Sequence, residues 1–229
     1  MKSVMPQNGS APAELETPMI DYYLGQLEQA FSRIECDVQS LHEGENAWEI
    51  DPEDGMYVFR GFMHPFYVQK HVVDLLREVW HIYDGTREII NAKWQAGQVQ
   101  VTDTDLDNGK GPGKAIVNKH VRSCRWVQLC GDLANLTKHY RLSHATKTGN
   151  GPPQLGDSML TCLTSGKMEF GTAPDGSREI KLEKPVPMRP TLVVLNENGQ
   201  VVGDAVEIAL KARDSWLVLL RACGFSFER

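Results

Sequence analysis

The spacing of apolar residues changes near residue 150 and divides the chain into two kinds of segment. Before that point, apolar side chains recur at steps of three and four over long stretches, which is the period of a helix with one buried face. After it, short runs rich in β-branched residues are separated by turn-forming residues, as is typical of strands. The chain of 229 residues therefore predicts an α+β protein that is mainly helical.

The periodic segments predict four helices. In the first, six apolar residues share one narrow face: Leu24, Leu27, Phe31, Ile34, Val38 and Leu41. Pro65 suits the first turn of the second helix, in which Asp84-Gly85 is a candidate interruption. Helical spacing returns near the end of the chain, around Trp216. We expect helices at about 18–41, 65–95, 114–145 and 204–223.

A β-rich insertion is expected at about 158–202, between the third and fourth helices. Within it, Asn198-Gly199 is a strong hairpin signal. Residues 42–61 are expected to form a loop with some extended structure, and residues 1–17 a disordered tail. Because the last helix is too apolar to be exposed, we expect it to complete a four-helix bundle, with 18–229 as a single domain. The alternative is a helical domain followed by a separate small α+β unit.

Composition excludes several classes of protein. The net charge of −6 argues against a broad surface for nucleic acid or anionic membrane, but not against a local basic site. No apolar run approaches the ~20 residues needed to cross a bilayer. The five cysteines are scattered and form no CxxC pair, so we expect reduced thiols in a cytoplasmic protein that binds no membrane. No motif predicts a metal or another cofactor.

One face of the third predicted helix carries an unusual polar row. Its members recur at helical steps: Arg125, Gln128, Asp132, Asn135 and His139. A solvated helix face is more often repeated Glu and Lys, whereas these residue types bind phosphates and exchange protons. Lys138 and Arg141 lie about 100° away around the helix and can contact a phosphate at its edge. The row therefore predicts a ligand or catalytic site, or alternatively a structural brace that holds the β-rich insertion through buried hydrogen bonds.

The segment Ala134-Asn135-Leu136-Thr137-Lys138-His139 resembles the signature of the HEPN superfamily of helical-bundle proteins. That signature has an Arg, a polar residue that is often Asn, a few further residues and a His. Asn135 and His139 match it, whereas Ala134 replaces the Arg that helps to hold the scissile phosphate in the family. The segment also resembles an uncharacterised bacterial family with an Asp-x-x-Asn-x-x-Lys-His helix before a β-rich segment, a resemblance that implies no activity.

The HEPN resemblance implies a metal-independent endoribonuclease, or a degenerate relative, in a bacterial phage-defence or toxin–antitoxin system. His139 would act as general base or acid, Asn135 would orient the phosphate, and Asp132 would hold the imidazole tautomer. The phosphate-binding residues would be Lys138, Arg141 and Arg125. The expected partners are RNA at this local site and a second copy of the chain or another protein. The alternative is a non-enzymatic binding or assembly module.

Two further patterns are expected to have no catalytic role. A charged edge on the second helix is expected to be solvated or paired between helices, because the HExxH metal arrangement is missing; its members are Asp74, Arg77, Glu78, His81 and Asp84. The Gly-rich run 108–114 lacks GxxxxGK[ST] and is expected to be a linker.

Overall fold

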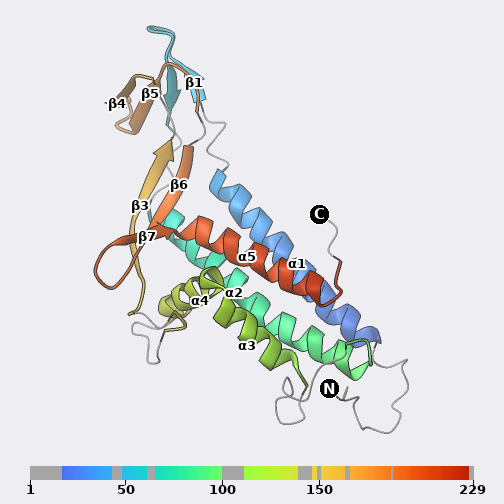
Figure 1. Ribbon diagram of the computed structural model, residues 1–229. Helices are drawn as coiled ribbons and strands as arrows, with labels where there is room; N and C mark the ends of the chain where they lie inside the picture. The colour runs from blue at the N-terminus through green and yellow to red at the C-terminus, as the bar shows by residue number, and fades with distance from the viewer. Residues whose placement is uncertain are drawn as a thin grey trace.

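The computed structural model describes residues 17–42, 48–60, 65–99, 111–138, 146–148, 151–162, 166–186 and 188–226. Within these residues the chain forms five helices and two antiparallel sheets, which confirms the prediction of a mainly helical α+β protein (Figure 1). The helices are α1 (Thr17–His42), α2 (Pro65–Gln95), α3 (Gly113–Ser123), α4 (Arg125–Lys138) and α5 (Ala205–Ala222).

Helix α2 is the centre of the helical part, because it packs against each of the other four helices. Its buried apolar residues run from Val68 to Trp94, on more than one side of the helix. The candidate interruption at Asp84-Gly85 is wrong, since α2 continues through it. Gly85 instead permits a close approach of α1: a Cβ at this position would lie 2.8 Å from Cδ2 of Leu27.

The single helix expected at 114–145 is wrong at Cys124, which separates α3 from α4. Cys124 has an extended backbone (φ −120°, ψ 107°), although its carbonyl still accepts a hydrogen bond from the Gln128 N–H at 3.1 Å. The break allows α4 to pack against both α2 and α5. No glycine or proline marks this position, so the apolar spacing alone could not reveal it. Residues 139–145, the expected end of the helix, lie outside the described residues.

In each of the two sheets, some neighbouring strands are not consecutive along the chain. The body sheet has the order β3-β6-β7, with β3 (Gln154–Cys162), β6 (Met188–Leu195) and β7 (Val201–Asp204). The distal sheet has the order β1-β2-β5-β4, with β1 (Trp48–Ile50), β2 (Tyr57–Phe59), β5 (Arg178–Leu182) and β4 (Met168–Thr172). The β-rich segment thus extends beyond the expected 158–202, and β5 of its central hairpin pairs with β2 from the expected loop at 42–61.

The distal sheet lies beyond the ends of β3 and β6, away from the helices (Figure 1). Trp48, Phe59, Ile180 and Phe170 lie opposite one another across its four strands, and therefore on one face. Phe59, Ile180 and Leu182 form a small buried cluster that is separate from the main core around α2. The distal sheet therefore has its own apolar stabilisation.

The body sheet joins the helical core through β6, whose Leu192 and Val194 are buried in the main cluster. The predicted hairpin at Asn198-Gly199 is confirmed as the turn between β6 and β7, where Gly199 has φ +76°. Asn196 shapes this turn, since its Oδ1 accepts hydrogen bonds from the backbone N–H groups of Asn198 and Gln200. None of the helices in the described ranges combines the length and apolar character that a membrane span requires.

Candidate functional site: a cleft at the start of helix α4

The predicted polar row lies along α4, but its members have different surroundings. Arg125 is exposed in the first turn, Asp132 is only 2% exposed, and Asn135 is half-buried. Lys138 is the last residue of α4, whereas His139 and Arg141 lie outside the described residues. The structure therefore describes the first part of the row in detail and does not test the acid–base role predicted for His139.

The carboxylate of Asp132 binds the segment that leads from the helices to β3. Its Oδ1 accepts a hydrogen bond from the Lys147 N–H at 2.7 Å, and its Oδ2 accepts from the N–H and the hydroxyl of Thr148 at 3.1 and 3.0 Å. A buried carboxylate that accepts three hydrogen bonds stabilises the backbone that it contacts. These contacts favour the structural alternative for Asp132.

Gly131 allows the same segment to approach α4. A Cβ on Gly131 would lie 2.6 Å from a ring carbon of Trp80 and 3.0 Å from Cδ of Lys147. The ammonium group of Lys147 lies 4.7 Å from the centre of the Trp80 ring, which is a cation–π geometry. The position of residues 147 and 148 is therefore set by α4 and α2 together.

A cleft of about 470 Å³ opens beside the first turn of α4. It lies between this turn, the residues Thr148, Gly151 and Pro153, and the β6–β7 hairpin. Its lining residues are Arg125, Gln128, Leu129, Thr148, Gly151, Pro153, Asn196, Glu197, Asn198 and Val202. Thr148 connects the buried Asp132 to the cleft, because it lines the cleft and is hydrogen-bonded to Asp132. Among the described members of the predicted row, Arg125 and Gln128 line the cleft, whereas Asp132 and Asn135 are not among its lining residues.

Several polar lining groups are already held by the protein. Gln128 donates from Nε2 to the Arg122 carbonyl at 2.9 Å, across the break between α3 and α4. The Asn196 side chain bonds within its own turn. In contrast, neither Arg125 nor Glu197 has an ion-pair partner among the described residues. The cleft therefore contains one positive and one negative group that are both available to a ligand.

The first turn of α4 adds to the positive character near Arg125. The initial N–H groups of a helix have no partners within the helix, and the helix dipole is positive at this end. Cys124 provides no side-chain cap of the usual Ser, Thr, Asp or Asn type. An anionic group is therefore favoured at this end of the cleft.

The sequence patterns did not predict the half of the cleft that Thr148, Gly151, Pro153 and the β6–β7 hairpin contribute. The hairpin itself was predicted from Asn198-Gly199, but nothing in local spacing places Glu197 beside α4. The glycine at position 151 is one further residue that reflects this contact. A Cβ on Gly151 would lie 1.6 Å from Oε2 of Glu197. A larger residue at this position would therefore force the Glu197 side chain to shift.

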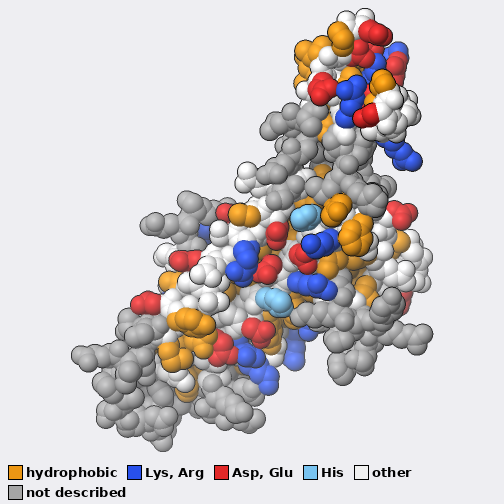
Figure 2. Space-filling view, turned by 180° about the vertical axis from the view of Figure 1, so that it is seen from behind, with side chains coloured by type: hydrophobic (Ala, Val, Ile, Leu, Met, Phe, Trp, Pro, Cys, Tyr) orange, Lys and Arg blue, Asp and Glu red, His pale blue; other side chains and the backbone are white. Residues whose placement is uncertain are grey.

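The charged edge predicted on α2 is confirmed as a paired and solvated surface. Arg33 of α1 contacts Glu78 at 3.0 Å, and Arg77 contacts Asp74 at 3.6 Å. Positive and negative side chains are interspersed over this face of the molecule (Figure 2). Burial and the neighbouring Glu78 raise the pKa of Asp37 beside this edge. Across the described residues, no group of three or more His, Cys, Asp or Glu side chains is arranged to hold a metal.

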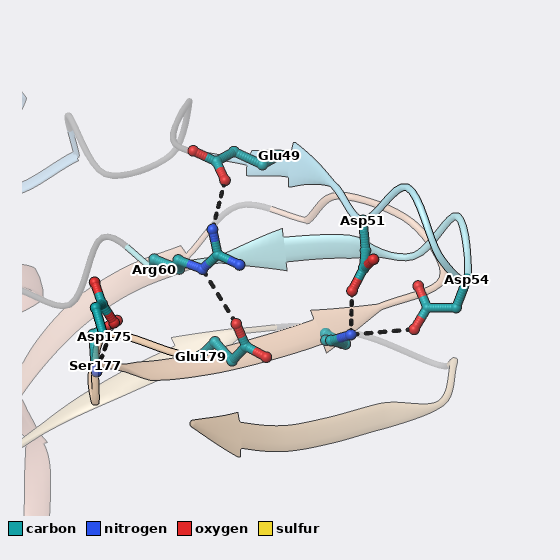
Figure 3. Close-up of polar contacts among 8 residues, drawn as sticks. Glu49, Asp51, Asp54, Arg60, Asp175, Ser177 and Glu179 are labelled. Atoms are coloured by element: carbon teal, nitrogen blue, oxygen red, sulfur yellow. Dashed lines mark hydrogen bonds and ion pairs between the residues drawn. The ribbon is translucent and has the colours of Figure 1, made fainter. Parts of the chain in front are cut away.

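A second polar cluster lies on the distal sheet and was not predicted. Arg60 contacts Glu49 at 2.8 Å and Glu179 at 3.2 Å, which joins β1 to β5 (Figure 3). Lys181 bonds to Asp51 and, at 3.2 Å, to Asp54 in the β1–β2 turn. The hydrogen bond from Lys181 lowers the pKa of Asp51, and the two carboxylates raise the pKa of Lys181. These groups satisfy one another, so the cluster is a set of cross-strand contacts.

Comparison of the chain with protein-family models, with curated proteins and with solved structures found no match. Assignment of a function therefore depends on the cleft and on the residues around it.

Proposed function

We propose that this protein is a binding module that holds a small polar ligand in the cleft at the start of α4. The observation that carries this proposal is the cleft itself, whose volume of about 470 Å³ is that of an ordinary small-molecule site. It combines a few polar groups with the apolar side chains of Leu129, Pro153 and Val202. Three of the ten lining residues are apolar and six are polar or charged, so the cleft suits a polar ligand better than an apolar one.

The contacts around the cleft support a site that is formed before the ligand binds. Asp132 fixes Thr148, Asn196 fixes the hairpin turn, and Gln128 is bound to the Arg122 carbonyl. A ligand that enters a preformed site loses less free energy to the ordering of side chains and loops. The same contacts support an architectural role for Asp132 near the site.

The HEPN-like ribonuclease stays a prediction from the sequence. It requires Asn135, Lys138 and His139 to face RNA, with a second copy of the chain supplying the opposing residues. It differs from the binding proposal in one measurable property, which is metal-independent cleavage of RNA that depends on His139.

The binding proposal is tested by native mass spectrometry of the full chain after incubation with a filtered small-molecule extract of bacterial cells. Val202 lines the cleft, so Val202→Trp should fill it and abolish the bound mass. Val201 is the matched control, because it is adjacent, 71% exposed and outside the cleft lining. We expect Val201→Trp to retain the ligand at the level of the unmodified protein.

The proposal fails if no small molecule is retained, or if Val202→Trp retains it as well as Val201→Trp. Thermal unfolding of both variants is measured alongside, so that loss of the fold is distinguished from loss of the cleft.

A further inference from the structure

We infer that the ligand of this cleft is a zwitterion, whose anionic group binds at Arg125 and whose cationic group binds at Glu197. This inference rests on the proposed function and extends it to the chemical class of the ligand. A small molecule with a carboxylate or phosphate at one end and an amine at the other has this chemistry.

The charge of the lining carries the first step. Arg125 and Glu197 are the charged members of the lining, and the other eight residues are neutral. A ligand with a single charge would pair with only one of these two residues. The other residue would then have no opposite charge to bind. A zwitterion satisfies both, and each contact is a charge-assisted hydrogen bond of the stronger kind.

Arg125 and Glu197 are also not paired with each other, which leaves both side chains for a ligand. Arg125 and Glu197 line the same cleft, yet they form no ion pair with each other or with another described residue. They belong to different elements, since Arg125 begins α4 and Glu197 lies in the β6–β7 turn. A ligand can therefore bridge them, with its carbon chain against Leu129 and Val202.

The third step is the contact between Gly151 and the side chain of Glu197. The ideal Cβ position on Gly151 would be 1.6 Å from Oε2 and 2.8 Å from Cβ of Glu197. The whole Glu197 side chain is thus seated on the Gly151 backbone, where an alanine would displace it. The positive end of the α4 dipole acts at the opposite group, near Arg125, and favours the ligand's anion there.

The test uses ω-amino acids of increasing length, from glycine to ω-aminooctanoate, as probes for the full chain. Isotope-labelled protein is titrated by NMR with each probe and with the n-alkylamine and the n-alkanoate of the same length. We expect an optimum chain length at which the zwitterion binds about tenfold or more tightly than either singly charged analogue. The affinity should fall as salt concentration rises.

Two single substitutions assign the ends of the ligand. Arg125→Gln should reduce binding of the best zwitterion to that of the alkylamine, and Glu197→Gln should reduce it to that of the alkanoate. Gly151→Ala should reproduce the effect of Glu197→Gln. Arg221→Gln and Glu53→Gln make the same changes in net charge at exposed positions away from the cleft, and should leave binding unchanged.

The inference is overturned if a singly charged analogue binds as tightly as the zwitterion, or if no ω-amino acid binds. In either case, a ligand from the cell extract that is lost in Val202→Trp would leave the proposed function intact. Failure of both experiments would overturn the proposed function as well.

Discussion

Asp132 of α4 binds Thr148 twice, through its backbone N–H at 3.1 Å and through its hydroxyl at 3.0 Å. The pair connects a buried helical carboxylate to a residue that lines the cleft. Because the Lys147 N–H also bonds to Asp132, the carboxylate fixes two consecutive residues of the segment that leads to β3.

Replacing Asp132 by Ala is expected to lower the free energy of unfolding by about 3 kcal/mol, since three donors lose their acceptor. Thr148→Val removes only the hydroxyl contact and should cost about 1 kcal/mol. Urea unfolding of both variants measures the difference. Equal stability of Asp132→Ala and the unmodified protein would show that these bonds do not hold the segment.

Gly131→Ala is expected to destabilise the protein by about 1 to 3 kcal/mol, because its methyl group would overlap the rigid ring of Trp80. Gly25→Ala is the matched control, as this glycine lies within α1 and a Cβ there would meet no atom within 4 Å. It should instead stabilise α1 by about 0.5 to 1 kcal/mol through the higher helix propensity of alanine. Similar changes in both variants would contradict the packing assigned to Gly131.

Phe59→Ala is expected to destabilise the distal sheet alone, by about 3 to 5 kcal/mol, because Phe59 belongs to the small cluster separate from the main core. Hydrogen exchange should accelerate in 48–60 and 166–186 and stay unchanged in α2 and α5. Leu75→Ala, in the main core, is the control and should accelerate exchange in the helices. Uniform acceleration in Phe59→Ala would mean that the two clusters unfold as one unit.

The protein is expected to lose stability as the pH falls through the ordinary histidine pKa of about 6.5. His120 lies on α3 with Nε2 3.0 Å from Oγ of Ser215 on α5, and burial lowers its pKa. The unfolded chain therefore binds the proton more tightly than the folded protein, and protonation favours unfolding. Urea midpoints at about pH 7.5 and about pH 5.5 measure this effect. His120→Gln should reduce the difference between them, and an unchanged difference would exclude His120 as its source.

The binding proposal and the ribonuclease hypothesis give opposite expectations for His139. We expect the purified protein to cleave RNA in metal-free buffer no faster than His139→Ala does. A ribonuclease that uses His139 would instead lose cleavage by about a hundredfold or more in that variant. The measurement is the rate of cleavage of a labelled RNA, and such a loss would support the catalytic interpretation of the polar row.

The helices were largely predictable, because the one-sided spacing of apolar residues is a local property that survives in the folded protein. The expected ranges 18–41 and 65–95 match α1 and α2 closely. The turn at Asn198-Gly199 was predictable for a similar reason, since a glycine there accepts the positive φ that the turn requires.

The break at Cys124 was not predictable, because the sequence there contains no glycine or proline and the modest helix propensities of Ser123 and Cys124 do not by themselves end a helix. The pairing of β2 with β5 was also not predictable, since it joins residues more than a hundred positions apart, such as Val58 and Lys181. Strand spacing identifies a strand but not its neighbour.

By itself, the sequence determined the mainly helical class of the protein, most of its helices and the polar face of α4, because periodicity and residue type are encoded locally. Only the tertiary structure decided what the described part of that face contacts. It buries Asp132 under Thr148, and it brings Glu197 and Gly151 from distant segments to the end of α4 where Arg125 lies. A cleft assembled from three segments depends on their packing, and no spacing within one helix specifies it.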